Sequence, residues 1–164
     1  MDETTAYHEA GHAVVALQLG AAVLSMSIDP DDDDGPRRYG EIEIGWPNDE
    51  FDDDQIRHRS VLVALAGPVA EMIYTGDPFH PGLVAEWKED WRTAWIASAS
   101  IFRDERQRLR FLEDVVAKLY RRLNSTHHWS AIAALVDQLL AHETLDEEQI
   151  ADAVYDWLEA WPYD

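Results

Sequence analysis

The sequence predicts an α+β fold that is mainly α-helical, in which an N-terminal helix and a small β-sheet precede a helical bundle. Two short segments, 23–28 and 40–45, alternate apolar and polar residues as half-buried strands do. From residue 56 onward, apolar residues instead recur at helical spacing. A length of 164 residues, of which 46% are hydrophobic, suits one domain with a core of its own.

The N-terminal helix is expected to begin after an N-cap at Thr4 or Thr5 and to end at Leu19, because Gly20 can stop it. The run DPDDDDGPRRY between the two strands is typical of a long turn. Its aspartates do not match a calcium loop, since Gly35 comes one place later than an EF-hand requires. We interpret the run as a solvated acidic loop.

Five further helices are expected, separated by turn-forming residues. They are predicted over 56–75, 84–103, 105–123, 128–142 and 146–160. Thr144 and Glu147 match a capping box at the start of the last one. Pro68 lies inside the first of the five and is expected to bend or break it.

Composition excludes several classes of function. The chain has no cysteine, so disulfides, thiolate metal ligands and cysteine nucleophiles are excluded. A formal net charge of −20 disfavours nucleic acids and anionic membrane surfaces as partners. The longest clean apolar run, residues 61–70, is shorter than the ~20 residues that a bilayer-spanning helix needs. Since no signal peptide opens the chain, we expect a cytoplasmic protein.

The run HEAGH in the first helix carries the clearest chemical signal. His8 and His12 lie one turn apart, so both imidazoles project from one face and can bind the same tetrahedral Zn²⁺. Glu9 then flanks the metal, where it can accept a proton from water. Gly11 costs about 1 kcal/mol relative to Ala in mid-helix. We therefore expect another element to pack closely against the backbone at Gly11.

Such a zinc site needs a third protein ligand, and without cysteine we expect a carboxylate farther along the chain. The inward stripe of the predicted helix 84–103 is rich in Trp, and Asp90 lies within about 60–70° of its centre. A carboxylate buried there is costly unless it is paired or bound to a metal. We predict Asp90 as the third ligand. Its structural alternative is a buried acid bonded to Arg92 or to a backbone amide.

Glu71 is the competing acid. It lies opposite the apolar stripe of its helix and faces Ala64 and Gly67 across a surface of small residues. We interpret Glu71 either as a group that orients one of the ligand histidines or as a plain structural acid.

Four segments carry a further signal, in order along the whole chain: TAYHEAGHAVVA, LVALAGPVAEMIYTG, EDWRTAWIAS and LLAHETLDEEQI. They resemble the zinc helix, the next helix, the segment of the third zinc ligand and the closing helical segment of the FtsH-type ATP-dependent zinc metalloproteases. The resemblance implies a single peptidase-like domain over 1–164 with a zincin-like N-terminal helix. Its zinc-site part would be 1–103 and its C-terminal helical part 104–164.

The resemblance also implies roles for individual residues. His8, His12 and Asp90 would bind Zn²⁺, and Glu9 would be the catalytic base. The 164 residues contain neither the family's membrane anchor nor its ATPase module, and they have no P-loop sequence for ATP. AGPVAE stands where the family has a Gly-Gly pair, and HPGLVAEWKED replaces its Gly/Ala-rich approach to the Asp. We expect either a free-standing protein or a fragment of a longer chain.

Two functions fit these residues. The first is a zinc metallopeptidase that acts without ATP on flexible or unfolded polypeptides, with GEIEIG as an edge strand for the substrate. The second is a peptidase-like zinc-binding interaction module with little or no catalytic activity, which the missing ATPase suggests. The complete set of ligands and base favours the enzyme. Seven Trp leave room for an apolar interface, and we expect a small homo-oligomer.

Overall fold

A computed structural model describes residues 3–28, 40–47, 49–78 and 80–158, and it confirms the mainly helical α+β fold. The described residues form α1 (Glu3–Gln18), α2 (Asp53–Thr75), α3 (Lys88–Ala97), α4 (Glu105–Leu123), α5 (Thr126–His142) and α6 (Glu147–Val154). They also form the strands β1 (Ala22–Ser27), β2 (Glu41–Gly45) and β3 (Thr144–Asp146). The predicted acidic loop lies outside the described residues.

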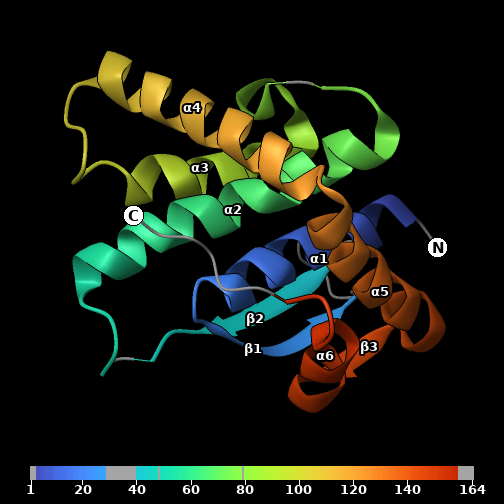
Figure 1. Cartoon of the computed structure of the whole chain (residues 1–164). Helices are drawn as coiled ribbons and strands as arrows, with labels where there is room; N and C mark the ends of the chain where they lie inside the picture. The colour runs from blue at the N-terminus through green and yellow to red at the C-terminus, as the bar shows by residue number, and fades with distance from the viewer. Residues whose placement is uncertain (1–2, 29–39, 48, 79, 159–164) are drawn as a thin grey trace, which may run out of the picture.

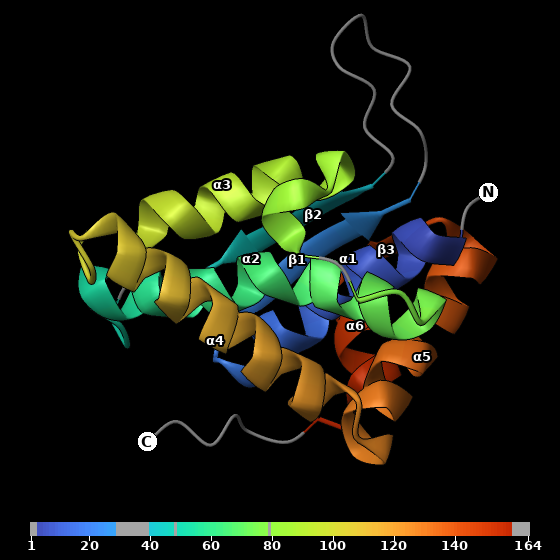
Figure 2. The same ribbon diagram turned by 90° about the horizontal axis from the view of Figure 1, so that it is seen from above.

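The helices are arranged around α1. Figure 1 shows α1 between the sheet and α2, while α3 and α4 pack on α2. Figure 2 shows α5 and α6 together at one end of the molecule, where α5 packs on α1. The buried apolar side chains of these layers form one core. None of the helices in the described part of the chain combines the length and hydrophobicity that crossing a membrane requires.

The sheet is antiparallel with the strand order β2-β1-β3. Met26 in the central strand pairs with Ile42 of β2 and with Leu145 of β3. The sequence analysis missed β3 and placed a capping box at Thr144, which is wrong. The box is instead formed by Asp146 and Gln149, each side chain accepting the other's backbone N–H. Three residues are too few for an alternating pattern to predict a strand.

Three helices differ in their bounds from the prediction: α1 begins at Glu3 and ends at Gln18, so neither Thr4 nor Thr5 is its N-cap, and α3 and α6 are shorter than expected. The segment 84–103 contains a 3₁₀ turn at Ala85–Trp87 before α3 begins at Lys88. The hydroxyl of Ser98 donates to carbonyls of the last turn of α3, which ends at Ala97. Helix α6 ends at Val154 rather than at residue 160. The predicted bounds of α4 are confirmed, because its amphipathic pattern is long and regular.

Helix α2 is not broken at Pro68, contrary to one of the two outcomes expected from the sequence. Its start is fixed by a capping box between Asp52 and Gln55. Its end is fixed by Gly76, whose positive φ of 79° allows its N–H to reach the carbonyl of Met72. Because α2 is capped at both ends and buried along one face, it continues through Pro68 although proline lacks the N–H of one helical hydrogen bond.

Gly11 lies where α1 and α2 cross. A Cβ built on Gly11 would stand 2.6 Å from Cβ of Ala70 and 2.7 Å from the carbonyl oxygen of Ala66. Both distances are far below van der Waals contact, so the two backbones approach closely only because this residue has no side chain. The close packing expected at Gly11 from the sequence is confirmed.

Gly11→Ala is therefore expected to destabilise the fold by about 1–2 kcal/mol. Overpacking costs about 1–3 kcal/mol, whereas the better helix propensity of Ala returns at most about 1 kcal/mol. Urea unfolding of the metal-free protein measures the difference. Gly45→Ala is the matched control, because a Cβ at Gly45 meets only Leu24 Cδ1 at 3.7 Å. Equal stability of the two variants would contradict the close crossing.

Candidate metal centre

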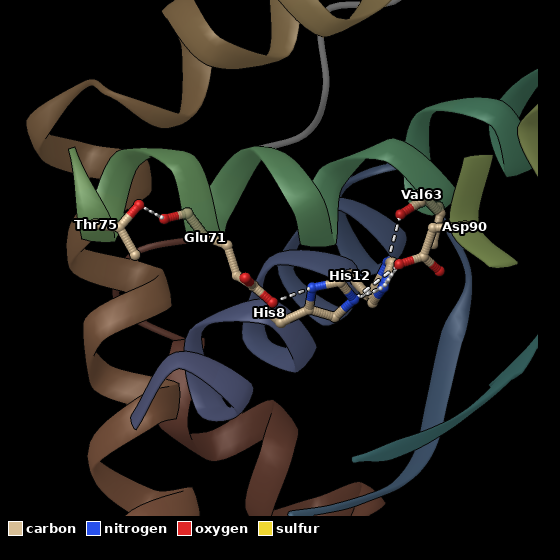
Figure 3. Close-up of polar contacts among 6 residues, drawn as sticks. All are labelled: His8, His12, Val63, Glu71, Thr75 and Asp90. Atoms are coloured by element: carbon tan, nitrogen blue, oxygen red, sulfur yellow. Dashed lines mark hydrogen bonds and ion pairs between the residues drawn. The ribbon is translucent and has the colours of Figure 1, made fainter. Parts of the chain in front are cut away.

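The first two candidate ligands lie on the face of α1 that is turned towards α2. Figure 3 shows the imidazoles of His8 and His12 directed to one point. Their Nε2 atoms are 3.1 Å apart, as expected for residues one helical turn apart on the same face. The i, i+4 spacing predicted from the sequence thus places two nitrogen atoms at the same spot.

Asp90 reaches the same spot from the first turn of α3. Its Oδ2 atom lies 2.8 Å from Nε2 of His8 and 3.4 Å from Nε2 of His12. Figure 3 shows its carboxylate beside the imidazole of His12. The ion pairs of the described residues connect Asp90 to the two histidines, and none connects it to Arg92. The side chains of His8, His12 and Asp90 are grouped closely enough to hold a metal ion.

The other nitrogen of each imidazole faces an acceptor on α2. His12 Nδ1 donates to the carbonyl of Val63 at 2.6 Å. His8 Nδ1 lies 2.8 Å from Oε1 of Glu71, close to the carboxylate although not in line for a hydrogen bond. A carbonyl only accepts, so Nδ1 of His12 carries its proton, and the carboxylate beside Nδ1 of His8 favours a proton there as well. In the neutral imidazoles both Nε2 atoms then present lone pairs, as metal-ligating histidines do.

The spacing of the three ligand atoms fits a tetrahedral ion. Ligands of a tetrahedral Zn²⁺ lie about 2.0–2.1 Å from the metal and hence about 3.3 Å from one another. The three separations here are 2.8, 3.1 and 3.4 Å. Two nitrogen lone pairs and a carboxylate oxygen this close together repel one another unless a cation or a proton lies among them. The residues present therefore fit a metal ion.

The close spacing of these groups also determines which of them are charged. Burial disfavours a charged His8, but the carboxylates of Asp90 and Glu71 outweigh burial and raise the pKa of His8 to about 10. The pKa of Asp90 is lowered, because the imidazoles of His12 and His8 outweigh the opposing effect of its burial. In the metal-free protein a proton balances the carboxylates, and metal binding would release it.

Glu9 lies beside the cluster and is almost fully buried, with 7% of its surface exposed. Burial raises the pKa of its carboxyl group, while the imidazoles of His12 and His8 act in the opposite direction. A Cβ built on Gly40, just before β2, would stand 2.8 Å from both Cγ and Oε1 of Glu9. The bare backbone at Gly40 therefore allows the chain to close over Glu9.

An open cleft of about 360 Å³ adjoins the cluster. It lies between β2, α2 and α3, and its lining residues include Ile42, Ile44, Trp46, Ser60, Val63, Ala64 and Thr93. His12 and Asp90 line it as well, so two of the three candidate ligands border a space that a substrate can enter. Most of the other lining side chains are apolar.

The structure brings together the residues that the sequence analysis selected, and it places Glu71 beside His8 rather than among the converging atoms. Sequence analysis missed the carbonyl of Val63 and the backbone of Gly40. A backbone carbonyl has no signature in the sequence. Gly40 was indistinguishable from an ordinary glycine at the end of a turn.

No protein-family model matches the chain, and no curated protein matches it significantly.

The purified protein is expected to bind about one equivalent of Zn²⁺. His8→Ala and His12→Ala should abolish binding, because each removes one of three ligands. Asp90→Asn keeps the shape but removes the charge, so affinity should fall by more than the ~10–100-fold typical of residues that only support a ligand. The loss of zinc affinity in Glu71→Gln should lie within that range. Competition titration against a chromophoric chelator measures each affinity.

The matched control for Glu71→Gln is Glu113→Gln, because Glu113 also faces an imidazole, 3.6 Å from Nε2 of His80, away from the cluster. That control should bind Zn²⁺ as the unmodified protein does. Full retention of zinc in Asp90→Asn together with its loss in Glu71→Gln would reverse the assignment of the two acids.

The metal-free protein is expected to lose stability as the pH rises from 6.5 towards 10. The pKa of His8 rises from 6.5 to about 10 on folding. Its contribution is therefore fully present below pH 6.5 and is lost as the pH passes through the folded value. Melting temperatures in a chelating buffer measure this slope. His8→Ala should flatten it and His80→Ala should not; an unchanged slope in His8→Ala would refute the ionisation described here.

Proposed function

We propose that this chain is a zinc metallopeptidase that hydrolyses peptide bonds in flexible or unfolded polypeptides. The observation that carries the proposal is the convergence of His8 Nε2, His12 Nε2 and Asp90 Oδ2 within 3.4 Å of one another. The buried carboxyl group of Glu9 lies beside them. The four segments that resemble the FtsH-type peptidase domain support the same reading.

Zinc is the ion that the donor set favours. Two imidazoles and one carboxylate leave a fourth coordination position open, which is the arrangement of hydrolytic zinc sites. The same donors also suit non-haem iron. The H-E-x-x-H order, which places an acid directly beside the first ligand, favours zinc and hydrolysis. Bound zinc would act as a Lewis acid on the scissile carbonyl and lower the pKa of water.

Glu9 is the proposed general base. It would take a proton from the attacking water and pass it to the nitrogen of the departing amine, so that no net proton is lost by the protein. A carboxyl group whose pKa is raised by burial both accepts and returns a proton more readily near neutral pH than an exposed one. Its burial also keeps it apart from bulk water.

The cleft suits an extended polypeptide. On one side β2 pairs with β1, and no other described strand pairs with its second edge, so that edge can accept a substrate as an additional strand. Ile42 and Ile44 of β2 and the nearby Trp46 line the adjoining cleft and would contact substrate side chains. Only a flexible or unfolded segment can lie along a strand edge in this way, which defines the proposed substrate class.

Glu9→Gln is expected to reduce cleavage of an unstructured protein such as casein by about 10²–10⁴-fold, the usual contribution of a general base. The amide keeps the size of the side chain but cannot take up the proton. Zinc content should stay near that of the unmodified protein, because Glu9 is not a ligand. Product formation is followed by mass spectrometry of the peptides.

Glu89→Gln is the matched control, since Glu89 is an exposed acid next to Asp90 in α3. It should cleave at the unmodified rate. Activity lost with a chelator and restored by Zn²⁺, but not by Fe²⁺, identifies the ion. A zinc-loaded protein that cleaves nothing, or a Glu9→Gln variant with full activity, would instead favour the interaction module.

A further inference from the structure

We infer that Gly67 is a positioning residue for the metal centre: its missing side chain leaves the space that the imidazole of His12 occupies. The inference concerns how the ligand is held and so goes beyond the proposed hydrolysis. It explains why a flexible residue stands in the middle of the long helix α2.

The contact between Gly67 and His12 is direct. A Cβ built on Gly67 would stand 2.3 Å from Nε2 of His12, 2.6 Å from Cε1 and 2.8 Å from Cδ2. These are the three nearest atoms, and all belong to one imidazole. Even one methyl group would therefore overlap the nitrogen that faces His8 and Asp90. The ring lies against bare backbone.

The ring cannot avoid such a group by turning freely. Its Nδ1 is fixed by the 2.6 Å hydrogen bond to the carbonyl of Val63, which is one helical turn before Gly67. A rotation of the imidazole that relieved an overlap at Nε2 would stretch or break this bond. Val63 and Gly67 together thus set both the orientation of His12 and the place of its free nitrogen.

The same face of α2 continues to the other histidine. Val63, Gly67 and Glu71 are spaced i, i+4 and i+8, so they lie along one side of the helix. His8 and His12 are spaced i, i+4 on the facing helix α1. Glu71 meets Nδ1 of His8, while the carbonyl of Val63 holds Nδ1 of His12 (Figure 3). The four-residue spacing of these positions on α2 therefore matches the four-residue spacing of the two histidines on α1.

Gly67 differs in this respect from Gly11, the other glycine of the crossing. A Cβ on Gly11 would meet Ala66 and Ala70, which are parts of the facing helix. Gly11 therefore sets how closely the helices approach. Gly67 meets a ligand and sets where that ligand lies.

The test compares Gly67→Ala in two backgrounds, using the metal-free protein. In the otherwise unmodified chain the substitution should lower the melting temperature, because the methyl group displaces a fixed imidazole. In the His12→Ala background the ring is gone, so the substitution should lower the melting temperature far less, because only the crowding of a Cβ against the following Pro68 remains. This difference between the two backgrounds is expected only if His12 is what Gly67 accommodates. The same shift in both backgrounds would overturn the inference.

A second measurement uses Co²⁺ as the probe, since its visible spectrum reports coordination geometry. Gly67→Ala should weaken Co²⁺ binding at least tenfold and alter the spectrum, whereas Gly45→Ala should leave both unchanged. Higher pH should not restore the Co²⁺ affinity of Gly67→Ala, because the imidazole of His12 is not free to move away from the added methyl group. Unchanged cobalt affinity and spectrum in Gly67→Ala would also refute the positioning role. Neither measurement uses peptidase activity, so a failure of the proposed function is seen separately, in the Glu9→Gln experiment.

Discussion

The structure depends above all on the close crossing of α1 and α2. Gly11 removes the side chain that would separate the helices, and Ala66 and Ala70 fill the contact with the smallest side chains available. Protein interiors are close-packed, so the distance between α1 and α2 is set by the particular atoms that meet at the crossing and not by the average hydrophobicity of the two helices. At the resulting distance a carbonyl and a carboxylate of α2 reach the rings of His8 and His12. A wider crossing would remove the α2 partner of each imidazole, the carbonyl of Val63 for His12 and the carboxylate of Glu71 for His8.

That arrangement concentrates charge in a place where charge is costly. Glu9, His12 and part of His8 are removed from water, and isolated charges there would be strongly unfavourable. The cluster is tolerated because the imidazoles and the carboxylates carry opposite charges. The carboxylates raise the pKa of His8 and His12, and the imidazoles lower the pKa of Asp90, so each group is stabilised in its charged form. Asp90 supplies the negative charge on the side open to the cleft. A divalent cation would take over the balancing role that a proton has in the metal-free protein.

The sequence predicts those parts of the structure whose residues repeat at a regular spacing along the chain. His8 and His12 share a face because four residues make about one helical turn, and α4 is bounded correctly because its pattern is long. The strand β3 and the cap at Asp146 were missed, since a three-residue strand exists only through its pairing with β1. The carbonyl of Val63 could not be foreseen either, because it depends on the approach of two helices and on no side chain of its own.

Asp90 shows how a residue of the cluster can be selected from a helix whose start is predicted wrongly. The phase of an amphipathic stripe is local, so extending the helix back to residue 84 did not change which side Asp90 faces. The true start at Lys88 changes its electrostatics instead, because it places Asp90 in the first turn of α3. A 3₁₀ turn leads into that end and no side chain caps it, and the positive end of the helix dipole there favours a negative charge. The short helix thus gives a reason, independent of any metal, why this position holds an ionised carboxylate.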